Sequence, residues 1–250
     1  MDAQTDQELF TEKGYADLLR TAKTGWRFIS YPEWDTPGRA VLWRHDVDAS
    51  MHRALALASI EARENVRATY FLYPHGMFYN LLETRVVRIV ARIAEMGHHI
   101  GLHFDPGHYS LSPLDARLRE ELLLFERRLI ERSFGVSVQA FSVHNPSSGW
   151  LASLGEREEA GMMNAYHPDL LGGVFRYVSD SNGYWRFQSL GEVLADGREE
   201  KLHVLTHPEW WTPGPMPPRG RLERAVRGRA KNCMADYDAL LARHGRRNVR

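Results

Sequence analysis

The sequence is poor in the features that stabilise small secreted proteins or anchor proteins in membranes. Its 250 residues include one cysteine, Cys233, which excludes an intrachain disulfide and a cysteine-cluster zinc site. No apolar run approaches the ~20 residues that a membrane helix requires. The start, MDAQTDQELF, is polar and acidic, unlike a secretory signal. We therefore expect a cytoplasmic protein without a membrane partner, in which Cys233 is a reduced, partly buried thiol.

The chain also lacks an excess of charge of either sign. It has 32 basic and 32 acidic residues, which argues against a general nucleic-acid partner. The terminal residues RHGRRNVR are basic, and we interpret them as a solvated end. With 43% apolar and 26% charged residues, the composition is that of a globular protein. A domain of this size buries roughly three quarters of its unfolded surface, so it needs no metal merely to fold.

Strand-like and helix-like segments alternate along the chain. Short apolar or β-branched runs predict strands at 40–46, 67–73, 98–104, 137–144 and 201–207. Apolar residues at helical spacing predict helices at 7–23, 50–66, 80–96, 115–132 and 219–243. We expect loops between 165 and 200, with short strands near Phe175 and Trp185. The alternation indicates one α/β domain, 1–250, with a parallel sheet that is open or closed into a barrel.

Two segments flank the predicted sheet. Residues 1–36 form a helical extension in this interpretation, and residues 219–250 form a charged helix and the basic tail. Within the predicted helix 115–132, the apolar stripe of Leu118, Leu122, Phe125 and Leu129 predicts the face that packs on the core.

Polar residues with catalytic or metal-binding chemistry follow several of the predicted strands. Asp46 and Asp48 end the first strand, and His103, His144 and His207 end three later ones. In parallel α/β folds, ligand sites gather at the carboxyl ends of the strands. We therefore expect these side chains to meet at one edge of the sheet.

The residue types suit a divalent metal ion. Asp46 and Asp48 are two apart, so on a continuing strand they share a face. His103 and His108 are separated by a Pro-Gly turn that allows both rings to reach one centre. Two imidazoles and one carboxylate with open positions are typical of a catalytic metal such as zinc. The second carboxylate then accepts a proton from water made acidic by the metal.

Four motifs in this order resemble the polysaccharide deacetylase superfamily, carbohydrate esterase family 4. They are RHDVD, ATYFL, GHHIGLHFDPGH and LHVLTHPEWW, between Val41 and Trp211. The resemblance implies a distorted (β/α) barrel with seven strands and metal-dependent removal of an N-acetyl or O-acetyl group. It implies that Asp46 is the general base, that His207 is the general acid, and that the metal ligands are Asp48, His103 and His108.

The chain departs from the family pattern in three places. Val47 separates two acidic residues that are usually adjacent, and the histidine pair is five apart rather than four. Asp105 and His144 are therefore alternative third ligands to His108. The family's third motif has an arginine, whereas the strand here reads FSVHNPSSGW. His144 or Asn145 takes that place, and both are candidate substrate contacts.

Four further residues complete the candidate site. Asp180 either pairs with His207 and raises its pKa or begins the Asn182-Gly183 turn. Trp185, Trp210 and Trp211 are candidate substrate contacts. For Trp210 and Trp211, stacking on a sugar ring and packing beneath a loop are equally open.

These observations predict a cytoplasmic hydrolase with one divalent ion, expected to be Zn²⁺. Its expected substrate is a small acetylated sugar or sugar conjugate. Two alternatives stay open: a metal-dependent amidohydrolase for a non-sugar substrate, and a barrel that binds glycans without catalysis. The presence of both Asp46 and His207 argues against the second, because binding needs neither a base nor an acid.

Overall fold

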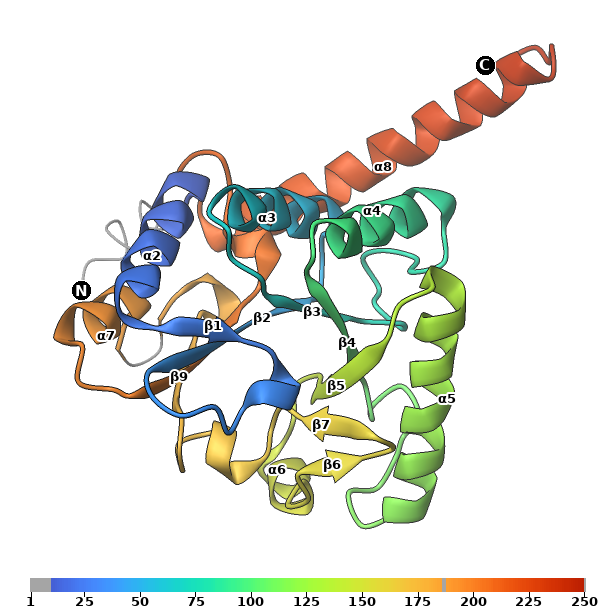
Figure 1. The fold of residues 1–250 in the computed structure, drawn as a ribbon. Helices are drawn as coiled ribbons and strands as arrows, with labels where there is room; N and C mark the ends of the chain where they lie inside the picture. Colours follow the sequence, from blue (N-terminus) through green and yellow to red (C-terminus); the bar gives the residue numbers. More distant parts are fainter. Residues whose placement is uncertain (1–9, 186–187, 250) are drawn as a thin grey trace.

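A nine-stranded sheet runs through the protein and carries helices on one side (Figure 1). The computed structural model describes residues 10–185 and 188–249. The strands are β1 (Arg27–Ile29), β2 (Ala40–Val47), β3 (Thr69–Leu72), β4 (His99–Phe104), β5 (Val138–Val143), β6 (Glu158–Glu159), β7 (Met162–Asn164), β8 (Arg176–Ser179) and β9 (Lys201–Thr206). The helices are α2 (Glu12–Gly25), α3 (Met51–Arg63), α4 (Thr84–Glu95), α5 (Ala116–Phe134), α6 (Ser148–Ser153), α7 (Leu190–Asp196) and α8 (Pro218–Arg243).

The predicted parallel α/β architecture is confirmed. The hydrogen-bonded order is β6-β7-β5-β4-β3-β2-β9-β8, and β1 pairs with the start of β2. Every pairing from β7 to β8 is parallel, and β6 alone joins in the antiparallel sense. Within residues 10–185 and 188–249, no strand pairing connects the two ends of this order, β6 and β8. The ladder is therefore open between these two strands.

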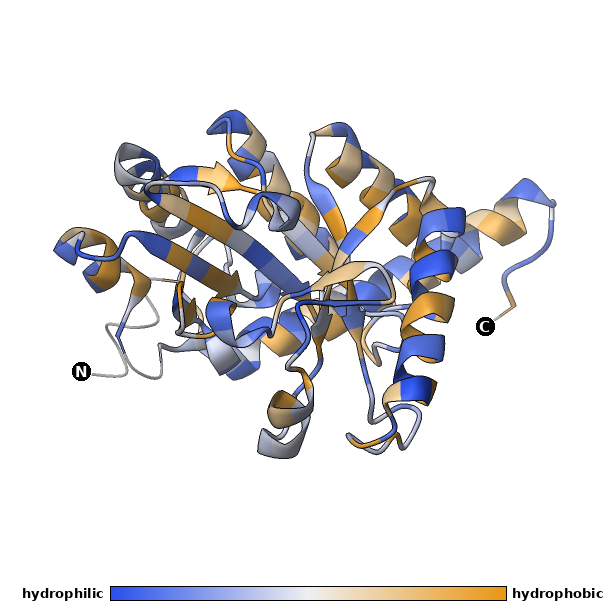
Figure 2. Cartoon of the chain, turned by 60° about the horizontal axis from the view of Figure 1, so that its bottom comes forward, coloured by the Kyte–Doolittle hydropathy of each residue, from blue (hydrophilic) through white to orange (hydrophobic). Residues whose placement is uncertain are grey.

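Strand β2 lies at the centre of the sheet and separates two environments. Because successive side chains point to opposite faces, Val41 and Trp43 join the larger core beneath the helices, whereas Leu42 joins a smaller core on the inner face. The same alternation sends Asp46 to the inner face and His45 to the helix side. Figure 2 shows the resulting mixture of hydrophilic and hydrophobic residues along the strands.

A buried polar cluster fixes β2 from the helix side. Glu61 of α3 is fully buried and accepts hydrogen bonds from the hydroxyls of Tyr15 and Tyr70. Its Oε1 lies 2.6 Å from His45 Nε2, and His45 Nδ1 lies 2.8 Å from Thr206 Oγ1. Burial tends to raise the pKa of Glu61, but the charge and hydrogen bond of His45 lower it below its usual value. The cluster thus connects α2, α3, β3 and β9 to the central strand.

Two sequence-based expectations about packing are wrong. The face that α5 buries is Arg119, Leu123, Glu126 and Ile130, whereas Leu118 and Phe125 of the predicted stripe are exposed. Cys233 is exposed rather than partly buried, because it lies on α8, whose C-terminal part projects from the body (Figure 1). In both cases the pattern identified a helix but not how that helix docks.

The element boundaries differ from the prediction mainly in the irregular region. Residues 7–9 of the predicted leading helix lie outside the described residues, and the helix is seen from Glu12. A strand, β8, lies close to Phe175, but Trp185 belongs to no strand. The helices α6 and α7 and the short strands β1, β6 and β7 were not predicted. No helix of the described chain has the length and apolarity to cross a membrane.

Gly101 on β4 is a testable packing constraint. A Cβ there would lie 2.5 Å from Phe71 Cδ1 on the neighbouring strand, well inside van der Waals contact. We expect Gly101→Ala to lower the free energy of unfolding by about 1 to 3 kcal/mol, the usual cost of overpacking. Chemical denaturation measures the change. The control is Gly155→Ala, where no atom of the described residues lies within 4 Å of the added Cβ. Equal stability of the two variants would contradict this account.

Candidate active site

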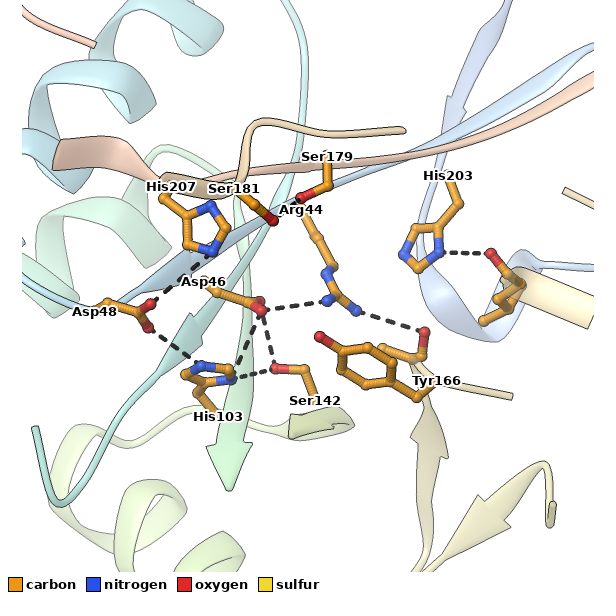
Figure 3. Close-up of polar contacts among 12 residues, drawn as sticks. Arg44, Asp46, Asp48, His103, Ser142, Tyr166, Ser179, Ser181, His203 and His207 are labelled. Atoms are coloured by element: carbon orange, nitrogen blue, oxygen red, sulfur yellow. Dashed lines mark hydrogen bonds and ion pairs between the residues drawn. The ribbon is translucent and has the colours of Figure 1, made fainter. Parts of the chain in front are cut away.

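The carboxyl ends of β2, β4 and β9 bring four predicted residues together (Figure 3). His103 Nε2 lies 3.2 Å from Asp48 Oδ1, and His207 Nε2 lies 3.9 Å from Asp48 Oδ2. Asp46 Oδ2 is 3.7 Å from the other nitrogen of His103, Nδ1. This convergence follows from the parallel register, which ends neighbouring strands at one edge.

Asp48, His103 and His144 form the candidate metal site of the described residues. One ligand atom from each lies within 4.8 Å of the other two. Burial tends to raise the pKa of Asp48, but its contact with His103 and the charges of His207 and His144 lower it below the usual value. Burial and His103 lower the pKa of His144. An ionised carboxylate and a neutral imidazole are the forms that bind metal.

The hydrogen bonds around His103 show that a cation fits this site. Ser142 has one hydroxyl hydrogen, which it donates to Asp46 Oδ1 over 3.3 Å, so it accepts from His103 Nδ1 over 2.7 Å. In the neutral imidazole, Nε2 is then a lone pair that faces Asp48, and a bound cation would take the place of the proton through which a charged His103 lowers the pKa of Asp48. Asp48 Oδ1 is buried and has no hydrogen-bond partner among the described residues. The lone pairs of His103 Nε2 and Asp48 Oδ1 thus face each other over 3.2 Å. A metal ion bound there would accept both of them.

The structure does not bring His108, the third ligand that the resemblance implies, together with Asp48 and His103. The ring of His108 stacks on His75 with centroids 3.6 Å apart and planes 5° apart. The turn causes this placement, since the amide of His108 donates to the carbonyl of Asp105. His144, one of the two alternatives, lies there instead, with a ring nitrogen within 4.8 Å of ligand atoms of Asp48 and His103. Asp105, the other alternative, accepts a hydrogen bond from Tyr73 Oη at 2.6 Å.

Arg44 is the residue that sequence reasoning missed. Its Nη2 lies 3.2 Å from Asp46 Oδ2, and both side chains are almost completely buried. Burial alone would lower the pKa of Arg44, but the charge of Asp46 and the neighbouring tyrosines raise it. The sequence contained a signal for this pairing. Arg44 precedes Asp46 by two residues on one strand, so both side chains lie on the same face. The pairing keeps a charged Asp46 inside the sheet, where an isolated carboxylate would be costly.

Asp180 and His207 form the second pair of the site. Asp180 Oδ1 lies 2.6 Å from His207 Nδ1, and the backbone amide of His207 donates to the same carboxylate at 3.0 Å. Burial tends to lower the pKa of His207, but Asp180, with help from Asp48, raises it to about 10. Nδ1 is held by Asp180, so Nε2 is the nitrogen that faces Asp48 and the open side of the site.

The structure places the candidate substrate contacts differently. Trp211 is fully buried and donates its indole N–H to Asp180 Oδ2 at 2.8 Å, and Trp185 is buried against Phe10. Neither forms a surface on which a sugar stacks. Trp210 is partly buried against the core. Asn145 is exposed beside His144, with Nδ2 3.1 Å from His144 Nε2, so these two residues lie at the rim of the site.

Neither a family model nor a curated protein matches the chain. Solved structures align distantly with it. A Streptococcus pyogenes deacetylase in complex with acetate shares 13% identity, with TM-score 0.39, over 56% of this chain and 66% of that one. A mutant family 4 carbohydrate esterase pseudoenzyme with restored activity shares 14%, with TM-score 0.45, over 77% and 62%. A Bacillus anthracis family 4 carbohydrate esterase shares 18%, with TM-score 0.43, over 87% and 86%.

The first of these proteins is named a deacetylase, and the other two are named as members of carbohydrate esterase family 4, which the motifs resemble. The chain spans less than two thirds of the length of the first two. Because all three TM-scores are below 0.5, the likeness decides neither the fold nor the activity. The functional conclusion therefore depends on the geometry of the site.

The third metal ligand is open to direct test. We expect His144→Ala to lose bound metal, because it removes one of three ligands, and His108→Ala to retain it. Metal content is measured by elemental analysis after the purified protein is equilibrated with Zn²⁺ and dialysed, and circular dichroism checks the fold. Retention by His144→Ala together with loss by His108→Ala would restore the sequence-based ligand set.

Proposed function

We propose that this protein is a metal-dependent deacetylase that hydrolyses an acetyl amide or ester on a small sugar or sugar conjugate. One observation carries the proposal. The candidate metal ligands Asp48 and His103 lie 3.2 Å apart. The buried carboxylate of Asp46 contacts His103 on one side. On the other side His207, which Asp180 orients, faces Asp48. A site that only binds a glycan needs neither a base nor an acid on either side of a metal site.

Asp48, His103 and His144 would hold the divalent ion, for which Zn²⁺ is our expectation. At such a site the ion supplies Lewis acidity, which allows water to lose a proton near neutral pH. Asp46 is the base that accepts this proton. Its Oδ2 bonds Arg44 and its Oδ1 accepts from Ser142, so the carboxylate is held in one orientation on the inner face.

His207 is the acid that protonates the departing nitrogen. An amide nitrogen leaves poorly as an anion, so it needs a proton donor at hand. The pKa of about 10 keeps His207 protonated at neutral pH, and Asp180 fixes the ring through Nδ1. Nε2–H remains available on the side that faces Asp48. The base thus lies on β2 and the acid on the segment that follows β9.

The sequence resemblance supports an acetylated sugar as the substrate. It also supports closure of the sheet into the family's distorted barrel with loops across the gap between β6 and β8. A cytoplasmic location stays a prediction. The amidohydrolase alternative differs from the proposal in the substrate alone, and the same residues would serve it.

The first test of the proposal uses Asp46. We expect the Zn²⁺-loaded protein to release acetate from acetylated sugars, measured enzymatically on a panel of N-acetyl and O-acetyl compounds. Asp46→Asn should retain its metal while turnover falls by about two orders of magnitude, because the general base is lost. Asp48→Asn is the matched variant, which should lose metal as well. Full turnover of metal-loaded Asp46→Asn would remove Asp46 from the mechanism, and no acetate release from any compound would refute the deacetylase.

The second test separates the acid from the rest of the site. We expect His207→Ala to reduce amide hydrolysis by about two orders of magnitude or more, because the nitrogen no longer receives a proton. An activated phenyl acetate should be spared, since its phenolate leaves without one. His108→Ala, outside the site, is the control and should change neither rate. An equal loss on both substrates would show that His207 acts in binding or folding rather than as the acid.

A further inference from the structure

A cavity of about 390 Å³ lies where α8 passes the beginnings of α3 and α4. Its walls come from Ala49–Arg53, from residues around Tyr79 and Arg85, and from the face of α8 between Arg221 and Asp236. Asp48, His103 and His144 do not line it, so it is separate from the metal site. It is nevertheless close to the metal site. Ala49, which lines the cavity, directly follows Asp48 in the chain, and Glu209, which also lines it, is two residues after His207.

The walls of this cavity, which we call the α8 cavity, are strongly cationic. Six basic residues line it against three acidic ones. The basic residues are Arg53, Arg85, Arg221, Arg224, Arg229 and Lys231, and the acidic ones are Glu83, Glu209 and Asp236. Two of the acids are already paired, Glu83 with Arg229 at 3.2 Å and Asp236 with Arg85 at 2.5 Å. In a chain of zero net charge, this local excess is not a property of the whole surface.

Several of these cations have no counter-charge in the cavity. Arg224 and Lys231 make no ion pair within the described ranges, and both are exposed on α8. Arg53 is 9% exposed, and burial lowers its pKa. Its guanidinium donates to the carbonyl of Trp211 and pairs at 2.8 Å with Glu12, which does not line the cavity. An anion bound in this space can therefore pair with Arg224 and Lys231 without breaking an ion pair of the described residues.

The backbone adds a second contribution of the same sign. The 13-residue helix α3 begins at this wall, with Ser50 as its capping residue, and Met51 and His52 line the cavity. The first amides of a helix lack partners within the helix and carry its positive dipole end. Helix starts of this kind bind phosphate in many proteins. The cavity also has room on the opposite side, since no atom of residues 10–185 and 188–249 lies within 4 Å of a Cβ built on Gly228.

We propose that the α8 cavity binds the phosphate group of a small phosphorylated ligand or a free phosphate ion. Phosphate carries two charges and several acceptor oxygens, and arginine pairs with it through two parallel N–H donors. The volume lies in the range of small-molecule sites and exceeds the need of a phosphate ion alone. Glu209 Oε2 is buried and lacks a hydrogen-bond partner in the described part of the chain, and it is an acceptor for a hydroxyl of the same ligand.

The test is calorimetric titration of the full-length protein at low salt with inorganic phosphate and with glucose 6-phosphate. We expect one ligand per chain. Arg224→Ala/Lys231→Ala should weaken binding about tenfold or more, as expected when charge-assisted hydrogen bonds are lost. Gly228→Glu should abolish binding by placing a carboxylate in the cavity. The control is Arg227→Ala on the same helix, which does not line the cavity and pairs with Glu223 at 3.7 Å.

The titration tests phosphate binding independently of any catalytic activity. Absence of phosphate binding by the wild type, or unchanged affinity in both cavity variants, would overturn the proposal. Measurement of acetate release then shows whether the bound phosphate is part of the substrate or a free ion. This second measurement rests on the proposed function. If the phosphate belongs to the substrate, Arg224→Ala/Lys231→Ala raises KM for N-acetylglucosamine 6-phosphate but not for N-acetylglucosamine. If it is a free ion, added phosphate changes the rate on N-acetylglucosamine in the wild type alone. Failure of acetate release refutes the deacetylase and leaves the titration result unchanged.

Discussion

The alternation of side chains along β2 is the constraint on which the rest of the site depends. It places Arg44 and Asp46 on the inner face of the sheet and His45 beneath the helices. His45 is held there by Glu61 and by Thr206, the residue immediately before His207. The same buried cluster therefore fixes the strands that carry the proposed base and the proposed acid, from the side that substrate does not reach.

Two carboxylates of one motif have different environments. Asp46 is buried and bonded to Arg44 and Ser142, which suits a group that must keep one orientation while it accepts a proton. Asp48 is partly exposed and faces two histidines, with one oxygen that has no hydrogen bond within the described residues. Such a difference in surroundings is how proteins assign different roles to similar residues. It supports Asp48 as the ligand and Asp46 as the base.

The charge of the molecule is balanced overall but not locally. Acidic side chains gather with histidines at the metal site, whereas basic ones gather along α8 and the start of α3. The two regions are neighbours, because the segments after β2 and β9 contribute to both.

The principal strands and the residues that end them could be predicted from the sequence, because a buried strand has a recognisable apolar pattern and parallel register brings strand ends together. Asp46, Asp48, His103 and His207 were predicted to meet for this reason, and they do. That His144 rather than His108 lies beside Asp48 and His103 could not be predicted, since local hydrogen bonds that spacing does not encode direct a ring after a turn. The tertiary structure also decided that Trp211 is buried and that Cys233 is exposed. Those outcomes depend on how loops and helices dock on the sheet, which involves contacts between residues far apart in the chain.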